Sequence, residues 1–298
     1  MKIAILVYAN QEVGFGHWYR SIALANHAKQ KEHLVWLIGN KMARGYDYFQ
    51  TREDFPDDLY HILHQVKPDV LVMDLQNKVP EHIYDIIDGT NTKTVVLNGV
   101  GYRNEDERAD ATIVQGYPDA PPTQANTFYG PEYVILRQSI FNMKWTPLTS
   151  WFVWGGARNK LDILDRFHKS MKDESAMIIA TNFAKNVPEP NTNHQVYIPE
   201  DEGIFPLMSI SKKACIAMGM VAWELAVLGM PIYAFSWSEG HLKFAKTMQE
   251  NGLLLAWDGI GLPPNEKIVG FLSRDFIPTG KRPDSKGVDR VLSIMEQL

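Results

Sequence analysis

A glycine-bearing segment near the start of the chain has the residue types and spacing that a catalytic loop needs. Gly14 and Gly16 flank a phenylalanine, His17 follows at once, and Arg20 stands three residues later. A strand-like apolar run precedes the segment and a helix-like run follows it. Backbone N–H groups at a helix start point outward and the helix dipole favours an anion there, so this turn suits a phosphate group. A histidine in the turn could act on a group beside the phosphate, although a tight turn with an incidental histidine would look the same.

Known phosphate motifs fit this segment poorly. The spacing resembles the dinucleotide fingerprint, but Tyr19 occupies the place of the third glycine. The second predicted strand leads into Gly39 and Asn40, where that fingerprint places an acidic residue for the ribose. No Gly-Lys-Ser or Gly-Lys-Thr follows, so the P-loop pattern is absent as well. The sequence therefore indicates neither a nicotinamide dinucleotide nor a P-loop nucleotide.

A second segment with a glycine and an acid lies near residue 220. A predicted strand ends at Gly219 and a helix begins at once, while Gly229 ends that helix and Pro231 opens the next strand. Glu224 stands about one turn into the helix, where its carboxylate can accept hydrogen bonds from both hydroxyls of a ribose. An acid in the first turn is also favoured by the helix dipole alone, so both interpretations stay open.

Other candidates are polar or aromatic residues near predicted strand ends. Asp74 follows an apolar strand and could hold an acceptor hydroxyl or serve as a second base, or it could fill a turn. Glu239 and His241 follow a later strand and could contact a phosphate or a sugar, or they could begin a solvated helix. Trp18 and Tyr19 stand beside His17, where their faces could stack on an acceptor or a sugar ring or could pack in the core.

Composition limits the classes of protein that fit. The chain has 298 residues, about twice the ~150 residues of a typical domain, so we expect two domains. The net charge of −5 gives no general attraction to nucleic acid or to an anionic membrane. Cys215 is the single cysteine, which excludes an internal disulfide and a cysteine-based zinc cage. No secretory leader and no apolar run of ~20 residues is visible, so we expect a cytoplasmic protein without integral membrane association.

Short apolar runs alternate with amphipathic runs, which is typical of βαβ units and parallel sheets. The predicted strands cover residues 3–8, 34–38, 70–73, 94–97, 112–114, 151–154, 177–181, 196–198, 214–217, 231–235 and 253–256. Residues 140–150 resemble a connector. We therefore predict an α/β protein with two Rossmann-like domains facing a cleft, residues 1–145 and 146–298, with ligands at the carboxyl ends of the strands.

The motifs together resemble a known family. Gly-x-Gly-His-x-x-Arg at residues 14–20 resembles the loop of the nucleotide-sugar hydrolase of pseudaminic acid biosynthesis and of its spore-coat polysaccharide relatives. These proteins are similar in turn to two-domain GT-B glycosyltransferases. The resemblance continues, in the same order, at residues 72–74, 129–137, 152–156 and 219–231.

This resemblance implies a nucleoside-diphosphate sugar, usually a UDP-sugar, as donor. The first domain would bind the acceptor and supply His17 as general base, facing the anomeric carbon. The second domain, which opens with Gly155 and Gly156, would bind the nucleotide, with Glu224 near the ribose and Gly219 near the pyrophosphate. Glu239 and His241 would also contact the donor, as would Gly14, Gly16 and Arg20 from the first domain. No metal or other cofactor is implied, because helix termini and a basic side chain can neutralise the leaving diphosphate.

Three departures from the family's pattern bear on the reaction. Met218-Gly219-Met220-Val221 replaces a Ser-Gly-Gly-Ser/Thr run, Asn98-Gly99 replaces a pair of aspartates, and Gly240-His241 replaces Asn-Gln. The changes near the sugar site favour glycosyl transfer over hydrolysis. The acceptor stays open between a saccharide, a lipid, a small molecule and a modified nucleobase in DNA. The alternatives are a hydrolase that releases free sugar and a catalytically silent nucleotide-sugar binding protein.

Overall fold

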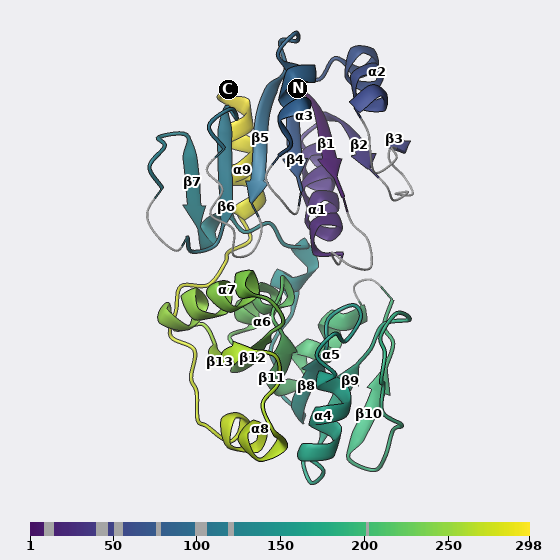
Figure 1. Cartoon of the computed structure of the whole chain (residues 1–298), viewed down its shortest axis with the longest axis vertical. Helices are drawn as coiled ribbons and strands as arrows, with labels where there is room; N and C mark the ends of the chain where they lie inside the picture. Colours follow the sequence, from purple (N-terminus) through teal and green to yellow (C-terminus); the bar gives the residue numbers. More distant parts are fainter. Residues whose placement is uncertain are drawn as a thin grey trace. The chain divides into compact units, whose positions relative to one another are not determined.

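The computed structural model describes residues 1–8, 15–39, 47–50, 56–75, 79–98, 106–118, 122–200 and 203–298. The chain forms two compact units (Figure 1). Unit 1 contains Met1–Arg137 and Ser285–Leu298, and unit 2 contains Gln138–Asp284. Each unit is built on its own parallel sheet, as the alternation of apolar and amphipathic runs predicted.

The sheet of unit 1 has the strand order β3-β2-β1-β4-β5-β6-β7 in the described residues. Its strands are β1 (Lys2–Val7), β2 (Leu34–Gly39), β3 (Asp47–Gln50), β4 (Val70–Asp74), β5 (Lys93–Asn98), β6 (Ala111–Gln115) and β7 (Thr127–Gly130). Strand β4 is buried along its whole length, and β1 and β5 are buried except at their first residue. Such strands consist almost entirely of apolar residues because helices cover both faces of the sheet.

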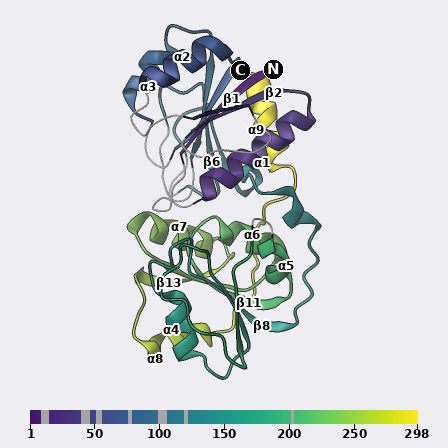
Figure 2. The same cartoon turned by 90° about the vertical axis from the view of Figure 1, so that its right-hand side faces the viewer.

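In the described parts of unit 1, four helices cover this sheet in two pairs. They are α1 (Gly16–Gln30), α2 (Pro56–Val66), α3 (Glu81–Ile87) and α9 (Gly287–Glu296). Apolar residues of α1 and α9 share one cluster with Ile3 and Ile5, whereas those of α2 and α3 share another cluster with Ala4 and Leu6. Alternate residues of a strand point to opposite faces, so the two pairs lie on opposite sides of the sheet, as Figure 2 shows.

The sheet of unit 2 has the strand order β10-β9-β8-β11-β12-β13. Its strands are β8 (Thr149–Trp154), β9 (Ala176–Ile179), β10 (His194–Tyr197), β11 (Ser211–Ala217), β12 (Ile232–Ser236) and β13 (Leu255–Ile260). Its helices are α4 (Ile163–Ser170), α5 (Ile204–Ser209), α6 (Val221–Leu228), α7 (Glu239–Glu250) and α8 (Asn265–Leu272). Helices α4 and α8 pack on one face around Trp151 and Phe167. Short 3₁₀ turns occupy Pro131–Tyr133 in unit 1 and Gln138–Asn142 at the start of unit 2.

The structure differs from the predicted domain boundaries. Residues 146–298 were assigned to the second domain, but the chain passes into unit 2 after Arg137 and returns to unit 1 at Ser285. Helix α9 packs on α1 through an apolar face that includes Val291 and Leu292. His27 of α1 also contacts Asp289 of α9, with 2.7 Å between Nε2 and Oδ1. The amphipathic pattern predicted the helix but could not indicate which sheet it covers.

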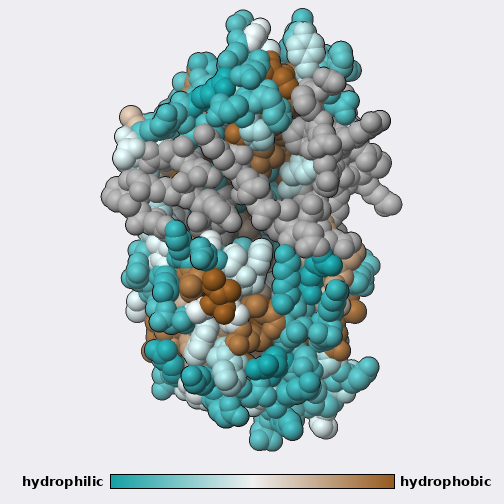
Figure 3. All heavy atoms as spheres, viewed as in Figure 1, coloured by the Kyte–Doolittle hydropathy of each residue, from teal (hydrophilic) through white to brown (hydrophobic). Residues whose placement is uncertain are grey.

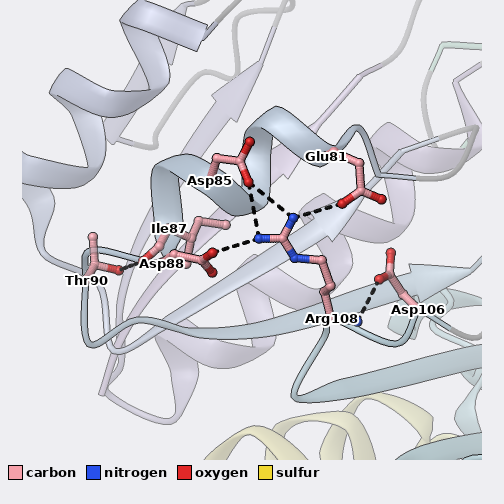
Figure 4. A network of polar contacts seen from close by, with 7 residues as sticks. All are labelled: Glu81, Asp85, Ile87, Asp88, Thr90, Asp106 and Arg108. Atoms are coloured by element: carbon pink, nitrogen blue, oxygen red, sulfur yellow. Dashed lines mark hydrogen bonds and ion pairs between the residues drawn. The ribbon is translucent and has the colours of Figure 1, made fainter.

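Arg108 ties the turn just before β6 to helix α3 (Figure 4). Its Nη1 donates to Glu81 at 2.8 Å, and its Nη2 donates to Asp88 at 2.8 Å. Both nitrogens also reach Asp85, at 3.2 and 3.3 Å. Glu81 and Asp85 lie on one face of α3 and Asp88 directly follows the helix, so the guanidinium neutralises three neighbouring like charges at an exposed site.

Hydrophilic side chains predominate on the face of unit 2 drawn in Figure 3, with smaller hydrophobic areas among them. Scattered apolar groups of this kind are usual on folded domains. Among the described residues, no helix combines the length and the apolar character that crossing a membrane requires.

A pair of histidines, the buried His194 and the partly exposed His168, joins α4 to β10 in unit 2. His194 is 0% exposed, its Nδ1 lies 2.9 Å from Nδ1 of His168, and its Nε2 lies 3.1 Å from the carbonyl oxygen of Met171. Burial lowers the pKa of His194, and the neighbouring His168 lowers it further against the opposing effect of the Met171 carbonyl. Below the ordinary histidine pKa of about 6.5, the unfolded chain therefore binds more protons than the folded unit.

We expect the melting temperature to fall as the pH is lowered from 7.5 to 5. One extra proton bound by the unfolded state costs at most about 1.4 kcal/mol per pH unit. His168→Gln keeps a hydrogen-bonding group beside His194 and removes one charge, so its melting temperature should fall less over the same range. Equal falls in both proteins, measured by circular dichroism, would show that the pair does not determine this loss.

Candidate functional site

The carboxyl end of β4 and the first turn of α1 bring His17 and Asp74 together. Asp74 is the last residue of β4 and pairs in register with Val7, the last residue of the neighbouring β1. Helix α1 begins at Gly16, so His17 lies in its first turn. Nδ1 of His17 lies 2.6 Å from Oδ1 of Asp74, and the His17 side chain is 16% exposed. The segment singled out from its glycines thus places a partly exposed imidazole against a carboxylate.

Two further residues of α1 hold the same carboxylate. Arg20 and Ser21 follow His17 by three and four positions, so all three side chains lie on one face of the helix. Nε of Arg20 donates to Oδ2 of Asp74 at 2.6 Å, and its Nη2 donates to Oδ1. The Ser21 hydroxyl donates to Oδ2 at 3.0 Å. Both oxygens of Asp74 are therefore engaged.

These contacts keep Asp74 ionised although it is 0% exposed. Burial by itself would raise the pKa of the carboxyl group. The charge of Arg20, then that of His17, and the hydrogen bonds from both outweigh burial and lower the pKa to about 2. Because the carboxylate is favoured in the folded state, it stabilises unit 1 above about pH 4, and this contribution is lost as the pH falls toward 2.

An ionised Asp74 determines where the proton of a neutral His17 lies. Nδ1 and a carboxylate oxygen could not approach to 2.6 Å if both were acceptors, so Nδ1 carries the proton and donates it. The lone pair then lies on Nε2, on the opposite side of the ring from Asp74. Nη2 of Arg20 also lies 2.9 Å from Nδ1, but with the proton on Nδ1 the two nitrogens are both donors and share Oδ1 of Asp74 as their acceptor. A histidine oriented in this way by a buried carboxylate is suited to accept a proton as general base.

The structure changes the interpretation of two residues in this segment. Arg20 was predicted to bind the donor, but it is 2% exposed and its guanidinium is engaged with Asp74, which favours a positioning role. Trp18 was predicted to stack on an acceptor, but it is 6% exposed within the core of unit 1 and so offers no open face. Tyr19 is half-buried and the guanidinium of Arg137 lies 4.8 Å from its ring centroid, so stacking by Tyr19 stays a prediction. Gly14 lies outside the described residues.

In unit 2 the predicted ligand residues gather at one edge of the sheet. Gly155 and Gly156 follow β8, Gly219 follows β11, and Glu239 begins α7 just after β12. Since every strand pairing of this sheet is parallel, the carboxyl ends of these strands meet at the same edge, where α/β sheets bind ligands. A Cβ atom at Gly219 would have no atom within 4 Å, so the space beside this residue is open.

Glu224 lies in the first turn of α6 and is 8% exposed. Its place one turn after Gly219 is the one that the sequence predicted. Contact with a ribose is not tested by the structure and stays a prediction.

His241 is held as a neutral side chain at the same edge. Ser238 caps α7, and its Oγ accepts from the backbone N–H of His241 at 3.4 Å and lies 2.8 Å from Nδ1 of the same residue. Burial, and then the charge of Lys160, lower the pKa of His241 to about 4. The imidazole is therefore uncharged at neutral pH and can contact a ligand only as a neutral group.

Sequence reasoning missed Ser21, Ser238 and Lys160. The helical spacing of Ser21 from His17 was a usable signal, and so was Ser238 as an N-cap before an acid. Lys160 follows the Gly155-Gly156 pair, but nothing in the sequence indicates its neighbours. Within the described parts of the chain, no group of three or more histidine, cysteine, aspartate or glutamate residues is placed to hold a metal ion.

Comparison with known proteins bears out the resemblance that the motifs predicted. The spore coat polysaccharide biosynthesis protein SpsG of Bacillus subtilis (strain 168) is 24% identical to this chain, and the match covers 100% of the chain and 98% of SpsG. MurG of Acinetobacter baumannii matches with a TM-score of 0.69 at 12% identity, covering 100% of both chains. No protein-family model matches.

A Methanocaldococcus jannaschii UDP-GlcNAc 2-epimerase, solved in complex with UDP-GlcNAc and UDP, also matches the whole chain. Its TM-score is 0.64 at 11% identity, with 100% of both chains covered. At these identities the solved structures show the fold alone, which is the GT-B type of α/β fold that the sequence predicted.

We expect Arg20→Leu to lower the free energy of unfolding by about 3–5 kcal/mol, because it leaves a buried carboxylate without its cation. Arg108→Leu is the matched control, since Arg108 also contacts several carboxylates but at an exposed site, where ion pairs are weak. Urea unfolding followed by circular dichroism measures both variants. A loss for Arg20→Leu no larger than that for Arg108→Leu would contradict a stabilising role for the buried pair.

Proposed function

We propose that this protein is a glycosyltransferase that uses a nucleoside-diphosphate sugar, with a UDP-sugar as the first donor to test. The observation that carries this proposal is the buried Asp74 carboxylate, held by Arg20, that orients His17 as a general base. This arrangement lies at the carboxyl end of a parallel sheet in a GT-B-type fold. A general base at the edge of the sheet where ligands bind is suited to remove a proton from a hydroxyl group of a substrate.

The donor is assigned to unit 2. Open space beside Gly219 and a buried first-turn acid, Glu224, suit a diphosphate and a ribose respectively. The complex of the M. jannaschii epimerase with UDP-GlcNAc and UDP supports a donor of this class. The likeness to SpsG, a spore coat polysaccharide biosynthesis protein, supports sugar chemistry as the setting.

The reaction follows from the chemistry of the base. Nε2 of His17 accepts the proton of the acceptor hydroxyl, while the oxygen of that hydroxyl forms a bond to the anomeric carbon. The bond from that carbon to the oxygen of the β-phosphate breaks, and the electron pair leaves with the nucleoside diphosphate. Asp74 stabilises the imidazolium that forms, without itself taking the proton. The proposed reaction needs no metal, provided that positive groups of unit 2 neutralise the leaving diphosphate.

Hydrolysis of the same donor is the second candidate. A histidine oriented by Asp74 could activate water as readily as an acceptor hydroxyl, so the base does not separate the two reactions. Gly240-His241 in place of the family's Asn-Gln favours transfer. A catalytically silent binding protein is disfavoured, because binding alone does not require a carboxylate and an arginine buried behind a histidine.

We expect His17→Ala to reduce turnover by about 10²- to 10⁴-fold while the affinity for the donor changes little, since a positioned base contributes about that factor. Asp74→Asn should also lose turnover, because the amide no longer favours the tautomer with its lone pair on Nε2. Nucleotide release from the active donor measures both variants. Turnover of His17→Ala close to that of the unmodified protein would exclude His17 as the base.

Transfer and hydrolysis are separated by a panel of UDP-, GDP-, CMP- and dTDP-sugars, assayed with and without saccharide, lipid, small-molecule and DNA acceptors. A transferase keeps water out of line until its acceptor binds, so we expect slow release of free sugar from the donor alone. The right acceptor should raise nucleotide release and suppress free sugar. The hydrolase would be established instead if free sugar forms rapidly and no acceptor raises nucleotide release above that rate.

A further inference from the structure

A lysine and a tryptophan from two different loops meet at the ligand edge of unit 2. Nζ of Lys160 lies 4.1 Å from the centroid of the Trp237 ring, the geometry of a cation–π contact. Lys160 lies on the loop after β8 and Trp237 directly follows β12. Strand β11 lies between β8 and β12 in the sheet, and neighbouring strands are about 4.8 Å apart. The contact therefore spans the carboxyl end of β11, where Gly219 leads into α6.

The loop that carries Lys160 is fixed by its own hydrogen bonds. Asn159 is 1% exposed, its Nδ2 donates to the carbonyl oxygen of Lys185 at 2.9 Å, and its Oδ1 accepts from the backbone N–H of Leu164 at 3.3 Å. Gly156 has a φ of +77°, which glycine adopts at little cost. The hydrogen bonds of the buried Asn159 side chain thus fix the backbone position of Lys160.

His241 packs on Trp237 as well, with 4.3 Å between the ring centroids and 39° between the planes. Ser238 Oγ accepts a hydrogen bond from the backbone N–H of His241, so the hydroxyl proton of Ser238 can be donated to Nδ1 of His241. The proton of the neutral imidazole then lies on Nε2, which becomes a donor. The positive charge beside Trp237 accordingly comes from Lys160 and not from His241.

Partial burial, and then the charge of Arg158, lower the pKa of Lys160. Two cations on one short loop repel each other, and an anion bound beside them relieves that repulsion. The space beside Gly219 is open, and the N-terminal N–H groups of α6 begin just beyond it. An ammonium group, a neutral donor and a helix start together suit a phosphate-bearing ligand.

We propose that Lys160 binds the diphosphate of the donor and is a catalytic residue, and that Trp237 is the residue that positions it. This inference rests on the proposed function. As the bond between the anomeric carbon and the β-phosphate oxygen breaks, that oxygen takes the electron pair and the ammonium group stabilises the added charge.

Lys213 provides a matched control within the same unit. Its Nζ also lies 4.1 Å from a tryptophan ring centroid, that of Trp151. Trp151 is 0% exposed and pairs in register with Lys213, three residues before β8 ends. Lys213 therefore makes the same type of contact away from the carboxyl ends of the strands.

The test compares the affinities of UDP, dTDP and GDP with those of uridine, thymidine and guanosine by calorimetry. We expect Lys160→Met to weaken the preferred diphosphate about 10- to 100-fold, the effect of losing a charge-assisted hydrogen bond, and to leave its nucleoside unchanged. Lys160→Arg should retain most of the affinity, because arginine keeps the charge and also stacks on indole. Lys213→Met should leave both affinities unchanged.

A double-mutant cycle tests the positioning role of Trp237. Trp237→Leu should weaken the diphosphate several-fold in the unmodified protein but add little in the Lys160→Met background, because it acts through the lysine. Additive losses would overturn that role.

The inference about Lys160 is overturned if Lys160→Met leaves the ratio of diphosphate to nucleoside affinity unchanged, or weakens both ligands equally. If the unmodified protein binds none of the three diphosphates, the proposed function itself fails and this inference fails with it. The two failures are distinguishable, because only the second appears without any substitution.

Discussion

The buried ion pair between Asp74 and Arg20 determines how helix α1 lies in the first unit. Asp74 has no access to water, so its charge is tolerated because Arg20, Ser21 and His17 together satisfy both oxygens. That requirement fixes which face of α1 lies against β4, and the same face carries His17. The position of the candidate base is thus a consequence of compensating a buried charge. Removing the carboxylate or the guanidinium would disturb the helix and the base together, which is why their effects on stability and on turnover have to be measured separately.

Local patterns predicted most of the fold, because strands that are buried on both faces are apolar throughout. Strands β3 and β7 were not predicted, since Asp-Tyr-Phe-Gln and Thr-Phe-Tyr-Gly are short and mixed in polarity. At the site, the glycine–histidine motif located His17, but motif letters do not show which way a helix faces, so Arg20 was assigned to the donor. The role of Lys160 could not be predicted from the sequence, because its contact with Trp237 exists only once β8 and β12 lie on either side of β11.

The two units use positive charge in opposite ways. Arg20 is 2% exposed and pairs with the buried carboxylate of Asp74, so its charge is neutralised inside the protein. Lys160 is exposed on its loop, and the nearby His241 is kept neutral by burial. A net charge of −5 over the whole chain hides this difference. Local arrangement rather than total charge therefore decides where an anionic ligand is expected.

The return of α9 to unit 1 makes unit 2 an insertion within the first unit's sequence. The polypeptide crosses between the units twice, after Arg137 and before Ser285. During synthesis, all of unit 2 leaves the ribosome before the helix that completes unit 1. During that interval α9 is absent, so the surface on the α1 side of the first sheet that Val291 and Leu292 cover stays exposed. The inserted unit can thus reach its native state first, while the unit that carries the candidate base is completed last.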